Sequence, residues 1–191
     1  MTRFTFKSCI QIEDEDAIVE LLFTVKDELY LPDKQVIRAI VSNLFAHGGV
    51  IGAYHGRQLC GMMGYFLGSP EQEYANKEVA FLYVGCILPS YRLTRMFHGG
   101  LLFALQQFAT IGVREIRLQA EAANPYTNRL YARFAQPLSH GKSLRGVPVI
   151  TYGGSLQVAL NHLAPRQRAL PALPPPHVES PGLPALVSHG K

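Results

Sequence analysis

The sequence contains no cysteine or histidine pattern that is typical of metal ligands, and this absence argues against a metal site. Its three cysteines, Cys9, Cys60 and Cys86, are odd in number and match no zinc spacing. Each lies in an apolar, strand-like segment, which is typical of a buried structural thiol. The seven histidines include no pair at the H-x-x-x-H spacing. We therefore expect no metal cofactor.

Long apolar runs and a leader-like start are lacking too. No run reaches the roughly 18–20 residues that a helix needs to span a bilayer. The first residues, MTRFTFKSC, alternate polar and apolar side chains and lack the apolar region of a secretory signal. These two absences predict a cytoplasmic protein with no membrane contact.

Dense runs of basic residues are also missing. The net charge is only +4, and Arg166, Arg168 and Lys191 near the C-terminus contribute much of it. A modest basic excess is compatible with an anionic cofactor or with nucleic acid. Because no Lys/Arg run carries interleaved aromatic residues, nucleic acid is the weaker of the two interpretations.

The sequence does contain enough apolar residues for one domain. The chain has 191 residues, of which 48% are hydrophobic. We expect a folded domain over residues 1–163 and a disordered tail over 164–191, where proline recurs and apolar periodicity ends. A tail without a partner is favoured over one that docks through the spacing of Pro171 and Pro174.

Periodicity within the domain predicts an α/β (α+β) chain. Alternating or apolar runs predict strands at 3–12, 50–54, 58–67, 77–88, 113–120 and 147–152. Helical spacing predicts helices from the acidic cluster at 13–16 to about residue 29, over 33–47, over 97–110 and from Asn124 onward. We interpret the acidic cluster as a solvated helix start rather than a substrate site. Residues 155–163 fit either a last strand or a helical turn.

One stretch, residues 80–105, carries the functional hypothesis. An apolar strand ends at Pro89, a basic turn follows, and helical spacing begins after it. A strand, a turn and a helix in this order offer backbone N–H groups and a helix N-terminus to a phosphate. Arg92 and Arg95 in the turn add charge-assisted hydrogen bonds. The alternative is a solvated basic turn that binds nothing.

The order of the elements and two of its segments resemble the GCN5-related N-acetyltransferase (GNAT) superfamily over roughly residues 4–152. Residues 87–92, ILPSYR, look like the V-x-P-x-Y-R end of the family's fourth strand. Residues 124–134, NPYTNRLYARF, are similar to its N-P-x-A-x-x-L-Y-x-K-x-G-F segment. The turn departs from the family, because Leu93 and Thr94 lie where its pyrophosphate loop usually has glycine.

The resemblance implies a mixed, mostly antiparallel central sheet flanked by helices, in which strands four and five splay apart. In the family, acyl-CoA lies in this opening, with its pyrophosphate at the turn and its pantetheine arm beside strand four. The residues implied to hold the cofactor are Cys86, Ile87, Leu88, Arg92, Thr94, Arg95, Met96, Phe97 and Asn124.

The resemblance also implies the catalytic groups. Tyr131 would reach the sulfur and protonate the departing thiolate, because a phenol with a pKa near 10 is neutral at neutral pH. Glu78 is the expected general base, with Tyr83 and Glu121 as open alternatives. By residue type, Tyr131 also fits a core aromatic residue, and Asn124 also fits a helix cap.

We therefore expect an acetyl-CoA-dependent N-acetyltransferase that acts on a primary amine. The implied partners are acetyl-CoA and the amine acceptor, and strand-edge pairing into a homodimer is common in the family. Two alternatives stay open. One is a catalytically silent GNAT-like module that binds through its proline-rich tail, and the other is an acyltransferase that acts on aminoacyl-tRNA. No motif in the sequence identifies the acceptor.

Overall fold

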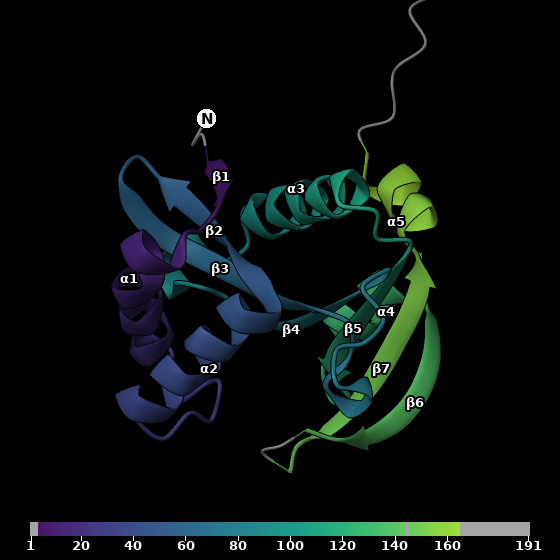
Figure 1. Cartoon of the computed structure of the whole chain (residues 1–191), viewed down its shortest axis with the longest axis horizontal. Helices are drawn as coiled ribbons and strands as arrows, with labels where there is room; N and C mark the ends of the chain where they lie inside the picture. The colour runs from purple at the N-terminus through teal and green to yellow at the C-terminus, as the bar shows by residue number, and fades with distance from the viewer. Residues whose placement is uncertain (1–3, 144–145, 165–191) are drawn as a thin grey trace, which may run out of the picture.

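The computed structural model describes residues 4–143 and 146–164 as a seven-stranded sheet with helices on both faces (Figure 1). The strand order is β1-β2-β3-β4-β5-β7-β6. Within it β4 and β5 are parallel and the other neighbours antiparallel, which confirms the predicted mixed sheet. The strands are β1 (Thr5–Ser8), β2 (Gly48–His55), β3 (Gln58–Leu67), β4 (Val79–Ile87), β5 (Glu115–Glu121), β6 (Gln136–Lys142) and β7 (Pro148–Ser155). The helices are α1 (Gln11–Thr24), α2 (Lys34–His47), α3 (Met96–Thr110), α4 (Pro125–Tyr131) and α5 (Leu156–Leu163), with 3-10 turns η1 (Pro70–Gln72) and η2 (Pro89–Tyr91).

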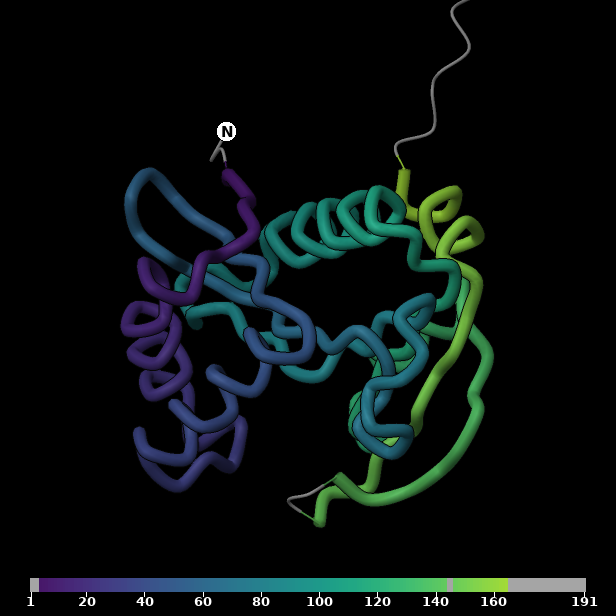
Figure 2. The backbone as a smooth tube through the Cα atoms, in the orientation of Figure 1, coloured from purple at the N-terminus to yellow at the C-terminus, as the bar shows by residue number. Residues whose placement is uncertain are grey.

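The two larger apolar cores hold helices on opposite faces of the sheet, and Figure 2 shows the path of the chain through these helices. In the first, Leu105 and Phe108 of α3 are fully buried together with Ile116 and Leu118 of β5. The second joins α1 and α2 to β2, β3 and β4, and among the described residues it has no member from β5, β6 or β7. The helices α1 and α2 therefore cover only one half of their face.

The parallel pairing of β4 and β5 is short. It runs from Val79 opposite Glu115 to Leu82 opposite Leu118 and then stops. Beyond that point β4 stays paired with β3 as far as Ile87, and β5 stays paired with β7 to its end. The two strands thus present unpaired edges to each other, and the predicted splay between strands four and five is confirmed.

The acidic cluster at 13–16 is less solvated than its sequence indicated. Asp14 is only 7% exposed and accepts hydrogen bonds from the Ile10 N–H at 2.8 Å and from Lys7 Nζ at 2.9 Å. Burial raises the pKa of Asp14, but these bonds and the Lys7 charge outweigh it and lower that pKa. The carboxylate therefore closes the first turn of α1, which begins at Gln11. The prediction that this helix continues to about residue 29 was wrong, because α1 ends at Thr24 and turns follow.

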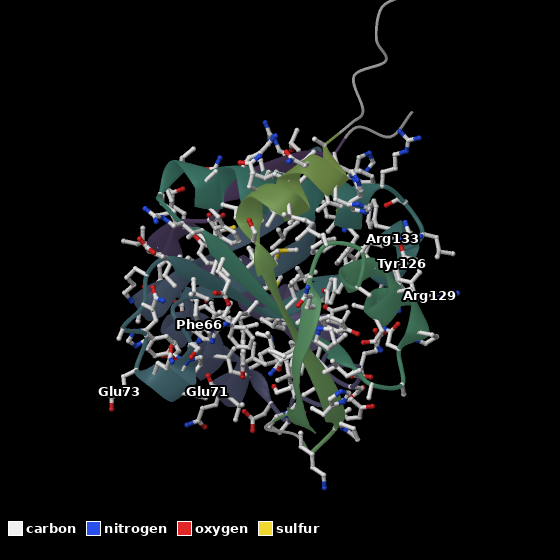
Figure 3. The ribbon with its side chains drawn as sticks, turned by 90° about the vertical axis from the view of Figure 1, so that its right-hand side faces the viewer. Phe66, Glu71, Glu73, Tyr126, Arg129 and Arg133 are labelled. Atoms are coloured by element: carbon white, nitrogen blue, oxygen red, sulfur yellow. The ribbon has the colours of Figure 1, made fainter. Side chains whose placement is uncertain are left out.

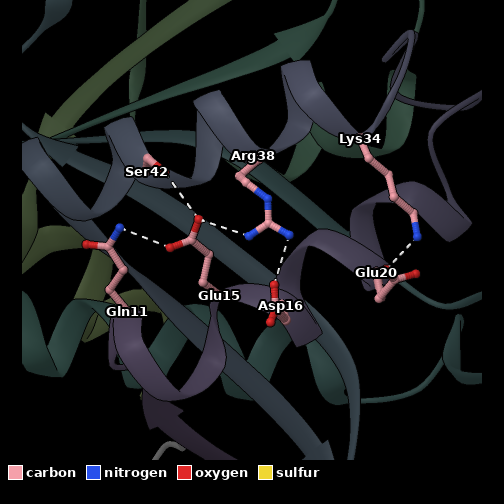
Figure 4. A network of polar contacts seen from close by, with 7 residues as sticks. All are labelled: Gln11, Glu15, Asp16, Glu20, Lys34, Arg38 and Ser42. Carbon is pink, nitrogen blue, oxygen red and sulfur yellow. Dashed lines mark hydrogen bonds and ion pairs between the residues drawn. The ribbon is translucent and has the colours of Figure 1, made fainter.

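A polar network ties α1 to α2 at the surface (Figure 4). Arg38 of α2 donates to Asp16 at 2.9 Å and to Glu15 at 3.4 Å, both on α1. Lys34 pairs with Glu20 farther along the same two helices. Exposed pairs of this kind contribute little free energy of unfolding each. Their main effect is to fix how the two helices lie side by side.

The C-terminal part of the domain differs most from its prediction. Strand β6 was not predicted, because Gln136–Lys142 is exposed at every position and shows no apolar alternation. It forms because β7 offers it an antiparallel partner. Residues 156–163 are helical: Leu156, Ala159 and Leu163 are buried at helical spacing in α5. The predicted tail lies outside the described residues, apart from Ala164.

Candidate functional site

An apolar pocket of about 260 Å³ lies between α3 and the unpaired end of β4. Five of the nine residues expected to hold a cofactor line it, namely Cys86, Ile87, Arg92, Met96 and Phe97. The sequence did not reveal the opposite wall, to which Phe6, Ala53, Met63 and Gly100 contribute. These residues come from β1, β2, β3 and α3, so only the sheet order brings them together.

The edge of β4 that faces away from β3 has no strand partner where it borders the pocket. The Leu88 N–H donates to the Cys60 carbonyl at 2.8 Å, on the β3 side. Because successive residues of a strand direct their backbone groups to opposite sides, those of Gly85 and Ile87 face away from β3. The Arg92 Nε agrees with this direction, since it donates to the Ile87 carbonyl at 3.2 Å. A ligand beside β4 therefore meets an open strand edge.

The start of α3 offers further donors. Its first N–H, at Met96, is taken by Thr94 Oγ1 at 3.2 Å, and the Gly99 N–H donates to the Arg95 carbonyl. The N–H groups of Phe97 and His98 have no partner among the described residues. Free N–H groups at a helix N-terminus suit a phosphate.

The turn before α3 follows a glycine-type path although it lacks glycine. Leu93 has φ +60°, in the left-handed region, and its side chain is fully exposed. A left-handed residue other than glycine costs roughly 1–2 kcal/mol. The turn therefore lacks glycine in its sequence and yet contains one residue in the left-handed conformation that glycine favours.

Arg92 is not free in this structure. Its guanidinium binds the Ile87 carbonyl through Nε and the Glu28 carboxylate through Nη2. Glu28 lies in the turn between α1 and α2, far from Arg92 in the sequence. Arg95, at the N-cap of α3, is exposed and makes no side-chain hydrogen bond or ion pair among the described residues. A ligand anion at the turn would thus meet one free arginine and one that is paired.

Tyr131 lies in the core rather than on the wall of the pocket. Its ring contacts Tyr152 and Phe134, with centroids 5.8 and 6.1 Å away. Burial raises the pKa of its hydroxyl to about 12. That hydroxyl has no hydrogen-bond partner among the described residues, yet no described polar atom is both sealed from solvent and unpaired. The ring is therefore buried while the oxygen reaches open space.

Asn124 caps α4. Its Oδ1 accepts from the Thr127 N–H at 3.1 Å, and its side chain lines no described pocket. Asn128, which the sequence did not single out, fixes the corner between β5 and α4. Its Nδ2 donates to the carbonyls of Glu121 and Asn124, and its Oδ1 accepts from Tyr152. Exposed Tyr126 and Arg129 lie on the same helix, and exposed Arg133 follows just after its end (Figure 3).

The three candidates for a general base lie in different places. Glu78 precedes β4 at the paired end, beside Arg114, and lines no described pocket. Five residues of strand, about 16 Å, separate it from Tyr83, where the splay opens. Tyr83 packs on Phe66 with centroids 5.1 Å apart. Glu121 ends β5 at the open end of the splay.

The described residues give no sign of nucleophilic or metal chemistry at this site. Burial raises the pKa of the Cys86 thiol to about 12, so the thiolate is disfavoured. Within 4–143 and 146–164, no three His, Cys, Asp or Glu side chains lie close enough to hold a metal ion. In the same ranges, no helix is long and apolar enough to cross a membrane.

Comparisons with known proteins identify solved structures that have a similar fold. No family model and no curated protein matches the chain. The ribosomal-protein-S18-alanine N-acetyltransferase from Escherichia coli superposes with a TM-score of 0.63 at 11% identity, covering 81% of this chain and 94% of that one. An acetyltransferase of the GNAT family from Staphylococcus aureus gives 0.60 at 13% identity, covering 81% and 99%. Ard1 from Thermoplasma volcanium gives 0.63 at 11%, covering 80% and 97%. Likeness at these identities is likeness of fold.

Proposed function

From the GNAT fold, which the chain shares with these structures, we propose that the protein is an N-acetyltransferase that uses acetyl-CoA to acetylate a primary amine. The observation that carries the proposal is the opening between β4 and β5, which ends beside the free N–H groups of α3. An open strand edge next to a helix N-terminus suits a long ligand with amides at one end and phosphates at the other.

The chain offers a partner for each part of such a ligand. The backbone groups of Gly85 and the N–H of Ile87, whose carbonyl is already bonded to Arg92, would bind the amides of the pantetheine arm. The N–H groups of Phe97 and His98, with Arg95, would bind the pyrophosphate, joined by Arg92 once it leaves Glu28. The apolar pocket between β4 and α3 would shield the arm from water.

The chemistry then requires a proton donor and a proton acceptor. Acetyl-CoA supplies a thioester, so that a C–N bond forms as the C–S bond breaks and sulfur leaves as a thiolate. Tyr131 would donate its proton to that thiolate, because its hydroxyl is protonated and has no partner among the described residues. We assign the removal of the amine proton to Glu121 rather than to Glu78, since Glu121 lies at the open end of the splay.

Calorimetry on the full chain tests the proposal. We expect acetyl-CoA to bind with a Kd on the order of micromolar to millimolar, and free CoA to compete for the same site. A panel of primary amines should then yield acetylated product and free thiol in equal amounts. Absence of heat at millimolar acetyl-CoA would remove the proposal, and binding without turnover on any amine would reduce the protein to a CoA-binding module.

Replacing Glu28 with glutamine should tighten the binding of CoA. The ion pair with Arg92 must break before that arginine can take a phosphate, and exposed pairs are worth up to about 1 kcal/mol, or roughly a fivefold change in Kd. Glu20→Gln is the matched control, since its partner Lys34 lies away from the pocket. If Glu28→Gln and the control bind CoA equally, the ion pair does not compete with the cofactor.

A further inference from the structure

A second pocket, of about 370 Å³, lies against the half of the sheet that α1 and α2 leave uncovered. Its polar lining comes from η1 and the segment before it and from β5, β6 and β7. The polar residues that line the pocket are Ser69, Glu71, Gln72, Arg117, Gln119, Ser139 and Thr151.

This pocket and the one beside α3 lie on opposite faces of the sheet. Ile116 and Leu118 of β5 are buried with α3, so the intervening Arg117 and the following Gln119 face the other way. Phe81 of β4, which also lines the second pocket, packs in the core beneath α1 and α2. Gln119 is the first residue of β5 beyond the paired segment. The gap between β4 and β5 therefore lies between the pocket on one face of the sheet and the pocket on the other.

The second pocket holds a buried hydroxyl with no partner. Ser69 is 4% exposed and its side chain makes no hydrogen bond within the described part of the chain. Because no described polar atom is both sealed and unpaired, this hydroxyl must reach open space, and the pocket is the space that Ser69 lines. A hydroxyl that faces a pocket without a protein partner is free to bind a ligand there.

Arg117 adds a partly satisfied guanidinium. Its side chain is 28% exposed, and its Nε donates to Glu115 at 2.9 Å. Its two terminal nitrogens have no partner among the described residues. Thr151 Oγ1 accepts from Gln119 Nε2 at 3.2 Å, so its own proton is free to donate. The floor of the pocket is thus rich in donors and carries an arginine fork, a combination that binds carboxylates in two-point geometry.

We propose that this pocket binds the acceptor of the reaction and that the acceptor is a small amino acid, held by its carboxylate on Arg117 and Ser69 while its amino group points to the splay. The inference rests on the proposed function and adds the class of acceptor to it. Glu71 of η1, labelled in Figure 3, also lines the pocket, and its charge would attract the ammonium form of the amine.

The test compares free α-amino acids with their α-carboxamides as ligands and as acceptors. The amide keeps the amine and the side chain but loses the negative charge. We expect calorimetry, with and without CoA, to show at least one amino acid that binds about 10- to 100-fold more tightly than its amide, as expected for charged hydrogen bonds. Turnover with acetyl-CoA should show the same preference in kcat/KM.

Two variants test whether the second pocket causes the preference for amino acids over their amides. Arg117→Gln should remove most of the difference between acid and amide, and Ser69→Ala should reduce it without loss of stability, because the hydroxyl has no partner to lose. Arg114→Gln is the matched control, since Arg114 lies just before β5, is 80% exposed and lines neither pocket. This control should keep the full preference.

Each result decides one of the two proposals. Amino acids that bind through Arg117 but are never acetylated support the pocket and count against the acetyltransferase activity. Acetylation of plain amines or amides as fast as amino acids, unchanged in Arg117→Gln, overturns the carboxylate site while the activity stands. If no amino acid binds in either condition, the inference is wrong, whether or not acetyl-CoA binds.

Discussion

Gly85→Ile should weaken the binding of acetyl-CoA by close to a hundredfold and leave the fold intact. Gly85 is an exposed residue in the stretch of β4 that is not paired with β5, and it lines the apolar pocket. A Cβ built there meets only the Met62 carbonyl, at 3.6 Å, which is ordinary van der Waals contact. An isoleucine therefore fits the strand, where β-branched residues are favoured over glycine. Its remaining atoms fill the space that we assign to the pantetheine arm.

The expected loss of affinity is large. If the arm buries about 100 Å² of apolar surface at about 25 cal/mol per Å², its exclusion costs about 2.5 kcal/mol, or close to a hundredfold in Kd. Calorimetry measures the loss, and a thermal melt checks that the midpoint of unfolding has not fallen. Gly141→Ile is the matched control, because Gly141 is also a strand glycine with no atom near its Cβ position and lies in β6. Equal CoA affinity in the two variants would show that the arm does not pass Gly85.

The part of the site that could be predicted from the sequence is the part built from local chain. An apolar run that ends at Pro89 predicts the end of β4, and helical spacing predicts α3 to within one or two residues of its observed start at Met96. The turn between them was predicted as basic and poor in glycine, and Leu93 shows that a turn can keep the left-handed path without glycine. Local patterns therefore fix which residues line one wall.

The part that could not be predicted depends on long-range pairing. Phe6 reaches the pocket because β1 pairs with β2, and Glu28 reaches Arg92 because α1 packs on β3 and the turn after it lies near β4. One signal was available in the sequence: Gly99 and Gly100 lie in an early turn of α3, where glycine is unfavourable. A Cβ at Gly99 would lie 2.8 Å from Phe6, so the pair marks a close approach. The sequence alone could not say which residue approaches.

Two chemical features also escaped prediction because they follow from burial. The sequence analysis grouped Asp14 with its solvated neighbours. In the structure its side chain is buried and accepts hydrogen bonds from Lys7 Nζ and the Ile10 N–H. Arg117 and Ser69 belong to no motif, and they line one pocket only because the fold brings residues 69–72 together with β5, β6 and β7. Burial decides the chemistry of such groups, and burial is a property of the assembled sheet.

Tyr131→Phe should lower kcat by about 10²-fold or more, which is the usual contribution of a general acid. Affinity for acetyl-CoA and stability should hardly change, because the hydroxyl that is lost has no hydrogen-bond partner among the described residues. Burial raises the pKa of that hydroxyl to about 12, so the wild-type protein should show no fall in kcat from its deprotonation until the pH approaches that value. Single-turnover kinetics separates the chemical step from product release.

Tyr152→Phe is the control that gives this result its meaning. Its ring lies 5.8 Å from that of Tyr131 in the same core, but its hydroxyl donates to Asn128 at 3.0 Å. Its removal should therefore cost about 1 kcal/mol of stability and change the chemical step much less. We therefore expect Tyr131→Phe to lower mainly kcat and Tyr152→Phe to lower mainly stability. If both lower kcat equally, or if neither does, Tyr131 acts only as a core residue and the proton reaches the thiolate from water.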